Sequence, residues 1–192
     1  MPYRSILCAL MLLMCGTLNA QTPASSAISY TRDVQPIFTQ SCVACHACYD
    51  SACQLNLGSA EGATRGASKV PVYDGERSQA QAPTRLFIDG LSPEQWRHKG
   101  FYSVLDAQGS QAALMARMLE LGRQAPLAPN AKLPADIVLG LDRQNMCPTP
   151  GEFDAYAGAH RREGMPLAVT GLSEGQYQTL QSWIAQGAPV DQ

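Results

Sequence analysis

The segment Cys42-Val43-Ala44-Cys45-His46 has the spacing C-x-x-C-H, which is typical of a site where c-type haem is attached. In such a site two thiols bind the porphyrin covalently, and the adjacent histidine ligates the iron. Residues at this spacing fit on one helical turn, which brings both sulfur atoms to one edge of the haem. We therefore expect Cys42 and Cys45 to hold haem c, and His46 to be the proximal iron ligand.

A C-x-x-C pair can also be a redox-active dithiol or part of a zinc site. A structural zinc site would need more histidines or a separate second C-x-x-C pair, and the sequence offers neither near the motif. The motif also follows an export signal and ends a predicted helix. Both features favour haem attachment over the two alternatives.

The first 20 residues have the pattern of a signal peptide. Arg4 is the positive start, residues 6–14 are apolar, and Ala20 ends an acceptable cleavage site. We expect cleavage after Ala20 and a mature protein in the periplasm. The apolar run is short for a membrane anchor of about 20 residues, and a lipid-modified Cys15 fits poorly because bulky Met14 precedes it.

The 192 residues suffice for one domain with insertions, and the net charge of −2 gives no electrostatic case for binding nucleic acid. After the signal peptide (1–20) we expect a flexible lead-in at 21–29 and one haem domain at 30–192. An insertion at about 47–109 is predicted to be largely irregular, with a short strand at 86–88.

Capping signals and apolar periodicity predict helices, so the expected fold is mostly α. Asp33 is the predicted cap of a helix that runs from Val34 to about Cys45, with the haem motif in its last turn. Four later helices are predicted, with these boundaries: Ser92 to Gly100, 110–123 with Gly122 near its end, Thr149 to Gly164, and Ser173 to Gly187.

Met165, which Pro166 follows, is the best candidate for the distal iron ligand. It falls between two predicted helices, and a thioether sulfur binds haem iron well. The alternative is an ordinary core or loop methionine. His160 and His98 are weaker candidates for the same position.

Three cysteines of the mature chain remain, and two of them should pair in an oxidising compartment. We expect a Cys48–Cys53 disulfide, which would close a small loop just after the haem motif. In the alternative, one of these two pairs with Cys147 and connects the start of the chain to a distant segment. The odd cysteine is then a free thiol.

Two basic groups could bind the haem propionates: Arg85 and the segment WRHK at 96–99. Solvated surface charge is the interpretation that we favour for both.

The order of several segments is similar to that of class I cytochromes c: YTRDVQPIF (30–38), the C-x-x-C-H motif, GMP (164–166), LS (172–173) and WIAQGAP (183–189). This resemblance implies a cytochrome c-like core, in which an N-terminal and a C-terminal helix cross and the haem lies between them. The stretch between His46 and Met165 is about twice as long as a minimal cytochrome c needs, so the long insertion requires its own explanation.

A second resemblance covers nearly the whole mature chain and is more specific. It is to bacterial fatty acid cis/trans isomerases, through CVACHACYD (42–50), CQLNL (53–57), RGASK (65–69), VYDG (72–75), PTRLFID (83–89), WRHKGF (96–101), LDR (141–143), CP (147–148) and EFDAY (152–156).

The second resemblance implies a periplasmic haem c enzyme that converts cis-unsaturated fatty acids, or phospholipid acyl chains at the membrane surface, to trans isomers. In the usual proposal, oxidised haem iron withdraws electron density from the double bond, which then rotates. Family members are several times longer, so the chain resembles their N-terminal haem region. A truncated product, a fragment and a split protein stay open, and a missing C-terminal region or a redox partner is implied.

Two other functions are compatible with the C-x-x-C-H motif: an electron-transfer cytochrome and a haem sensor. An electron carrier has no use for the long insertion and its isomerase-like segments, which favours the isomerase. A bound Met165 would close the iron to substrate. Either Met165 then dissociates, or an electron passes across the haem edge.

Overall fold

The computed structural model describes residues 27–47, 51–70, 72, 82–137, 139 and 146–191. The predicted signal peptide, most of the lead-in, Cys48 and the segment 141–143 lie outside these residues. No helix in the described part is both long and apolar enough to cross a membrane.

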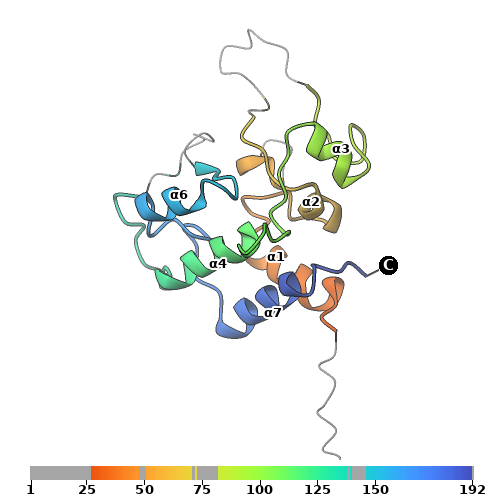
Figure 1. Cartoon of the computed structure of the whole chain (residues 1–192). Helices are drawn as coiled ribbons and strands as arrows, with labels where there is room; N and C mark the ends of the chain where they lie inside the picture. Colours follow the sequence, from red (N-terminus) through yellow and green to blue (C-terminus); the bar gives the residue numbers. More distant parts are fainter. Residues whose placement is uncertain are drawn as a thin grey trace, which may run out of the picture.

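The described elements are helices joined by irregular segments (Figure 1). They are a π-helical turn at Tyr30–Val34, α1 at Gln35–Ser41, a 3-10 turn at Ala52–Gln54, α2 at Ala60–Arg65, α3 at Pro93–His98, α4 at Leu114–Gln124, α6 at Phe153–Ala159 and α7 at Glu174–Ala185. β-Pairing in the described ranges consists of three isolated bridges. The mostly α prediction is therefore confirmed there, whereas the cytochrome c-like core and the domain boundaries stay predictions.

The predicted strand at 86–88 is wrong, because these residues form a tight turn. The backbone N–H groups of Ile88 and Asp89 donate to the carbonyl of Arg85, at 3.2 and 3.0 Å. The carboxylate of Asp89 accepts a further bond from the Arg85 N–H at 2.6 Å. An aspartate that bonds the local backbone in this way competes with sheet formation.

Three aromatic rings join the two ends of the described chain. Trp183 of α7 lies 5.8 Å from the Tyr30 ring and 5.9 Å from the Phe38 ring of α1, measured between centroids. All three side chains are buried. The α4 helix also contacts α7, and Figure 1 shows α1, α4 and α7 together in the lower half of the molecule. The contact between these three rings holds α1 and α7 together and supports the segments next to both helices.

Local capping signals predict the ends of α7 well. Ser173 and Gln176 form the expected reciprocal capping box, and Gly187 follows the helix with φ of +85°. At α3, Ser92 Oγ accepts from the Gln95 N–H, also as expected. Each of these caps is formed by residues within one helical turn, so it can be predicted without knowledge of tertiary contacts.

Three other predicted boundaries differ from the structure. The first helix ends at Ser41 instead of near Cys45, because the Phe38 carbonyl accepts from both Cys42 and Val43. The α4 helix starts at Leu114, since Gln111 pairs with Gln108 in a separate bridge. The α6 helix ends at Ala159, before it reaches Gly164.

Candidate functional site

A cavity of about 570 Å³ is lined by residues of α1, α4 and α6 and of segments between helices. Its volume lies within the range of about 300–1,000 Å³ that is usual for small-molecule and cofactor sites. Both motif cysteines, His46 and Met165 line it, so the structure brings all four predicted haem-site residues to one cavity. The rest of the wall is mainly apolar and includes Phe38, Leu57, Val104, Leu114, Met115, Met118, Leu119, Tyr156, Leu167 and Val169.

The C-x-x-C-H motif enters the cavity on a turn that directly follows α1. The N–H groups of Cys45 and His46 both donate to the Cys42 carbonyl, at 3.1 and 3.0 Å. The two thiols are not bonded to each other or to another described cysteine. Burial raises the pKa of Cys42 to about 11, so this thiol is protonated at neutral pH. Two unpaired thiols at the edge of an apolar cavity suit covalent attachment of a cofactor.

His46 is held firmly in the cavity wall. Its side chain is buried, with 6% of the residue exposed, and its carbonyl accepts from the Leu57 N–H at 2.6 Å. Burial lowers the pKa of His46, and backbone groups of Ala52 and Leu55 oppose this shift. The imidazole is therefore neutral at pH 7, which is the form that ligates a metal. Within the described residues its Nδ1 has no hydrogen-bond partner of good geometry.

Met165 reaches the cavity because two backbone segments approach closely. Its N–H donates to the carbonyl of Met118 in α4 at 2.9 Å. A Cβ on Gly164 would overlap the backbone of Gly122, and a Cβ on Gly122 would overlap that of Met165. Both glycines are therefore needed where residues 164–165 cross the end of α4. The positions of Gly122 and Gly164 in the sequence suggested only helix ends. The close contact between the two glycines was not predicted, and their lack of side chains is the signal that it leaves in the sequence.

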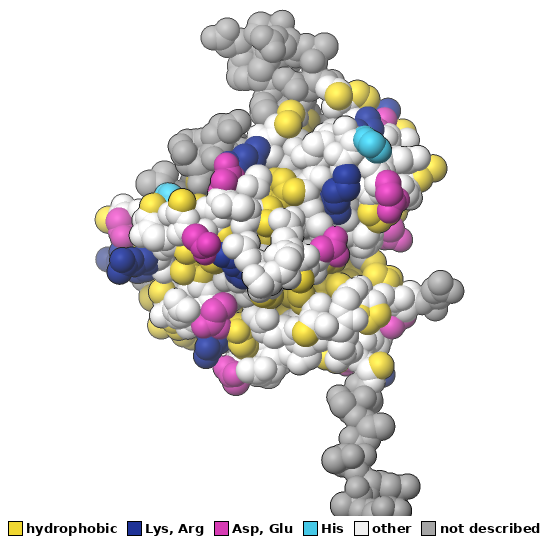
Figure 2. All heavy atoms as spheres, in the orientation of Figure 1, with side chains coloured by type: hydrophobic (Ala, Val, Ile, Leu, Met, Phe, Trp, Pro, Cys, Tyr) yellow, Lys and Arg dark blue, Asp and Glu magenta, His cyan; other side chains and the backbone are white. Residues whose placement is uncertain are grey.

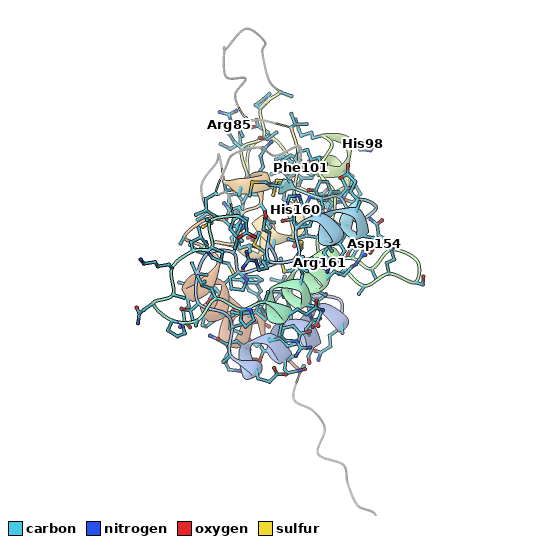
Figure 3. All side chains as sticks on the ribbon, turned by 90° about the vertical axis from the view of Figure 1, so that its left-hand side faces the viewer. Arg85, His98, Phe101, Asp154, His160 and Arg161 are labelled. Carbon is cyan, nitrogen blue, oxygen red and sulfur yellow. A yellow bond between two sulfur atoms is a disulfide. The ribbon has the colours of Figure 1, made fainter. Side chains whose placement is uncertain are left out.

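The two alternative histidine ligands are not among the residues that line the cavity. Figure 3 labels both and shows them at separate places in the molecule. His160 stacks on Tyr156 with 4.6 Å between ring centroids, and its Nδ1 lies 3.1 Å from Glu163 Oε1. His98 is exposed at the end of α3. Of the three candidates for the distal position, Met165 is the residue whose location suits that role.

The basic residues that were considered for haem propionates also lie away from the cavity wall. Arg85 pairs with Asp89 at 3.0 Å. Arg97 donates to the carbonyls of Arg65, Phe101 and Thr64, and Lys99 donates to that of Pro83. These cations hold the inserted segments together.

A disulfide joins Cys53 to Cys147 in the cavity wall, with 5.5 Å between their Cα atoms. The predicted Cys48–Cys53 pair is therefore wrong, and the Cys147 alternative is correct for Cys53. The Cys53 carbonyl accepts from the Ser68 N–H, and the Cys147 carbonyl accepts from the Tyr102 hydroxyl. The paired backbones of Ala67 and Tyr102 thus bring the two cysteines together, which their spacing in the sequence does not reveal.

The family model for fatty acid cis/trans isomerase (CTI) matches residues 81–192, which is more than half of the chain. The matched segment includes Cys147 and Met165 but not the C-x-x-C-H motif. No curated protein and no solved structure matches the chain.

Proposed function

Because the chain belongs to the fatty acid cis/trans isomerase family, we propose that it is the haem c-bearing part of a periplasmic isomerase that acts on cis-unsaturated acyl chains. The family is one of isomerase enzymes with fatty acid substrates. The observation that carries the haem assignment is the shared cavity of Cys42, Cys45, His46 and Met165.

Each of these residues would have a distinct part in holding haem. Cys42 and Cys45 would form the thioether bonds, His46 would ligate the iron from one face, and Met165 would approach from the other. A bound haem supplies an iron that can accept one electron. The apolar wall, which includes Val104, would exclude water from the site.

The residues after Met165 offer a path for an acyl chain. Leu167 and Val169 line the cavity, and Val169 is exposed at the surface. An acyl chain could therefore meet apolar side chains at the cavity mouth without entering its centre. In this approach Leu167 and Val169 would hold the acyl chain at the mouth, while Met165 would keep its place in the cavity wall.

Electron transfer without a lipid substrate is the second candidate function. The presence of both His46 and Met165 in the wall favours it, since two axial ligands are typical of electron carriers. The family match favours the isomerase.

The test is to express the chain in the periplasm of a host that attaches haem c. A pyridine haemochrome spectrum should show covalent haem, and the Cys42→Ser/Cys45→Ser variant should lack it. The protein is then incubated with a cis-monounsaturated fatty acid, and the products are separated by gas chromatography. We expect a trans isomer with the double bond at the original position. Covalent haem without any trans product would favour the electron carrier, and absence of covalent haem would refute the assigned site.

A further inference from the structure

Three large apolar side chains are exposed together just before α3. The exposed fractions are 59% for Phe87, 64% for Ile88 and 79% for Leu91, and we call these three residues the apolar tip. None of them lines the cavity. In Figure 2 hydrophobic atoms lie open to solvent on the part of the surface where Figure 1 labels α3, beside basic and acidic side chains. Clustered apolar groups at a surface mark a site of interaction.

The turn fixes the apolar tip in its exposed position. The Asp89 carboxylate accepts from the Arg85 backbone at 2.6 Å and from its guanidinium at 3.0 Å. Phe87 has φ of +69°, a left-handed conformation that is unfavourable for a bulky residue. The Arg85–Asp89 bonds hold the backbone in this conformation, so the turn is a defined local structure and not a frayed loop.

The other end of the turn is anchored to α3. The Leu91 N–H donates to Gln95 Oε1 at 2.7 Å. Gly90 lies flat against the buried Trp96, and a Cβ there would come within 2.7 Å of the indole ring. The indole thus supports the turn from below, which keeps the apolar tip from folding back onto the protein.

We propose that the apolar tip inserts into the surface of the lipid bilayer that contains the substrate acyl chains. This inference rests on the proposed function, because that function places the substrate in a bilayer. The tip comprises three side chains, whereas a stable protein–protein interface uses about 20–30 residues on each side. Phe, Ile and Leu side chains next to charged groups are typical of segments that lie in the membrane interface.

The charges at the base of the tip suit phosphate headgroups. The Arg85 side chain is 56% exposed. A hydrogen bond from the Arg85 side chain, and after it the charges of Arg85 and Lys99, lower the pKa of Asp89. Two cations therefore flank one carboxylate. Arginine and lysine can keep their charged ends at the headgroups while apolar neighbours enter the acyl region.

The experiment is a flotation assay with the full haem-loaded chain and vesicles of phosphatidylethanolamine and phosphatidylglycerol with monounsaturated acyl chains. The variant Phe87→Ser/Ile88→Ser/Leu91→Ser removes the apolar tip. The matched control is Val190→Ser, a substitution at a 45% exposed residue near the other end of the chain. We expect the tip variant to bind vesicles at least about ten-fold more weakly, because three apolar side chains lose their burial. The control should bind like the parent.

Two further measurements separate this proposal from the proposed function. Conversion of a dispersed free fatty acid should be the same in the tip variant and the parent, while conversion of vesicle lipids falls with binding. Unchanged haem and circular dichroism spectra show that the variant is folded. If neither protein forms a trans product but the tip variant loses vesicle binding, the isomerase proposal fails and membrane docking stands. Equal vesicle binding by parent and variant would overturn the docking proposal. The docking proposal would also be overturned if the parent did not bind vesicles but formed a dimer that the variant cannot form.

Discussion

Gly122 and Gly164 touch backbone to backbone where the segment that carries Met165 crosses the end of α4. Neither position has room for a side chain, because a Cβ on either would overlap main-chain atoms of the other segment. Backbone atoms in an ordered helix cannot move aside for an added Cβ as a flexible side chain can. This crossing therefore determines where Met165 meets the cavity.

The Gly164→Ala substitution should displace Met165 and destabilise the fold. Overpacking of a close contact costs about 1–3 kcal/mol, and urea denaturation would measure the loss. If Met165 ligates haem iron, the haem spectrum should also change, because its sulfur would be displaced.

Gly158 provides the control for this substitution. It lies within α6, and a Cβ there would meet no atom within 4 Å. Gly158→Ala should leave the spectrum unchanged and raise stability by about 0.5–1 kcal/mol, because alanine is the better helix former. Equal effects of the two alanine substitutions would contradict the importance of the Gly122–Gly164 crossing.

Loss of the Cys53–Cys147 disulfide should destabilise the protein strongly. The bond closes a loop with a sequence separation of 94 residues. Removing a disulfide from a small secreted domain costs about 2–5 kcal/mol. Urea denaturation of Cys147→Ser should show a loss in this range, and the freed Cys53 should react with a maleimide after unfolding.

Cys48→Ser distinguishes this pairing from the one that sequence spacing favoured. If Cys53 pairs with Cys147, the Cys48 substitution should not change the midpoint in urea. A midpoint that falls as far for Cys48→Ser as for Cys147→Ser would restore the Cys48–Cys53 pair.

The contact between α4 and α7 should weaken in acid. Glu120 accepts from Arg123, from Gln124 and from the Tyr177 hydroxyl of α7, the last at 2.6 Å. These bonds, led by that from Arg123, lower the pKa of Glu120 from 4.5 to about 2. A carboxyl whose pKa is lower in the folded state stabilises the fold above its unfolded pKa. That stabilisation is lost as the pH falls from about 4.5 through about 2.

Thermal unfolding of Glu120→Gln at a series of pH values tests this contribution. The midpoint of the variant should fall less steeply than that of the parent between pH 4.5 and 2. Tyr177→Phe, which removes one of the donors, should give an intermediate slope. Identical slopes for parent and Glu120→Gln would show that this carboxylate does not couple folding to pH.

The sequence predicted best what depends on neighbouring residues. The caps at Ser92 and Ser173 need only one turn of chain. The C-x-x-C-H spacing likewise fixes Cys42, Cys45 and His46 near each other, and all three line the cavity. Met165 was predicted as the distal ligand from its position between helices and from the resemblance to cytochromes c, and it lines the same cavity.

Features that depend on distant segments were missed. The pairing of Cys53 with Cys147 depends on the Ala67–Tyr102 bridge. Short spacing favoured Cys48 as the partner of Cys53, because the entropy cost of closing a loop is small for residues close in sequence. Tertiary contacts instead place Cys147 beside Cys53.

Replacement of Met165 tests the distal side of the cavity most directly. If its sulfur ligates the iron, Met165→Ala should remove the weak near-infrared sulfur–iron band and raise the spin state. Met115→Leu is the control, since Met115 also lines the cavity but lies on the buried face of α4. A leucine of similar volume there should leave the band in place. If Met165→Ala raised the spin state and also sped isomerisation, Met165 would be a ligand that must leave the iron before substrate can approach. If the spin state rose while isomerisation kept its rate, the reaction would proceed at the haem edge. An unchanged spectrum would remove Met165 from the axial position altogether.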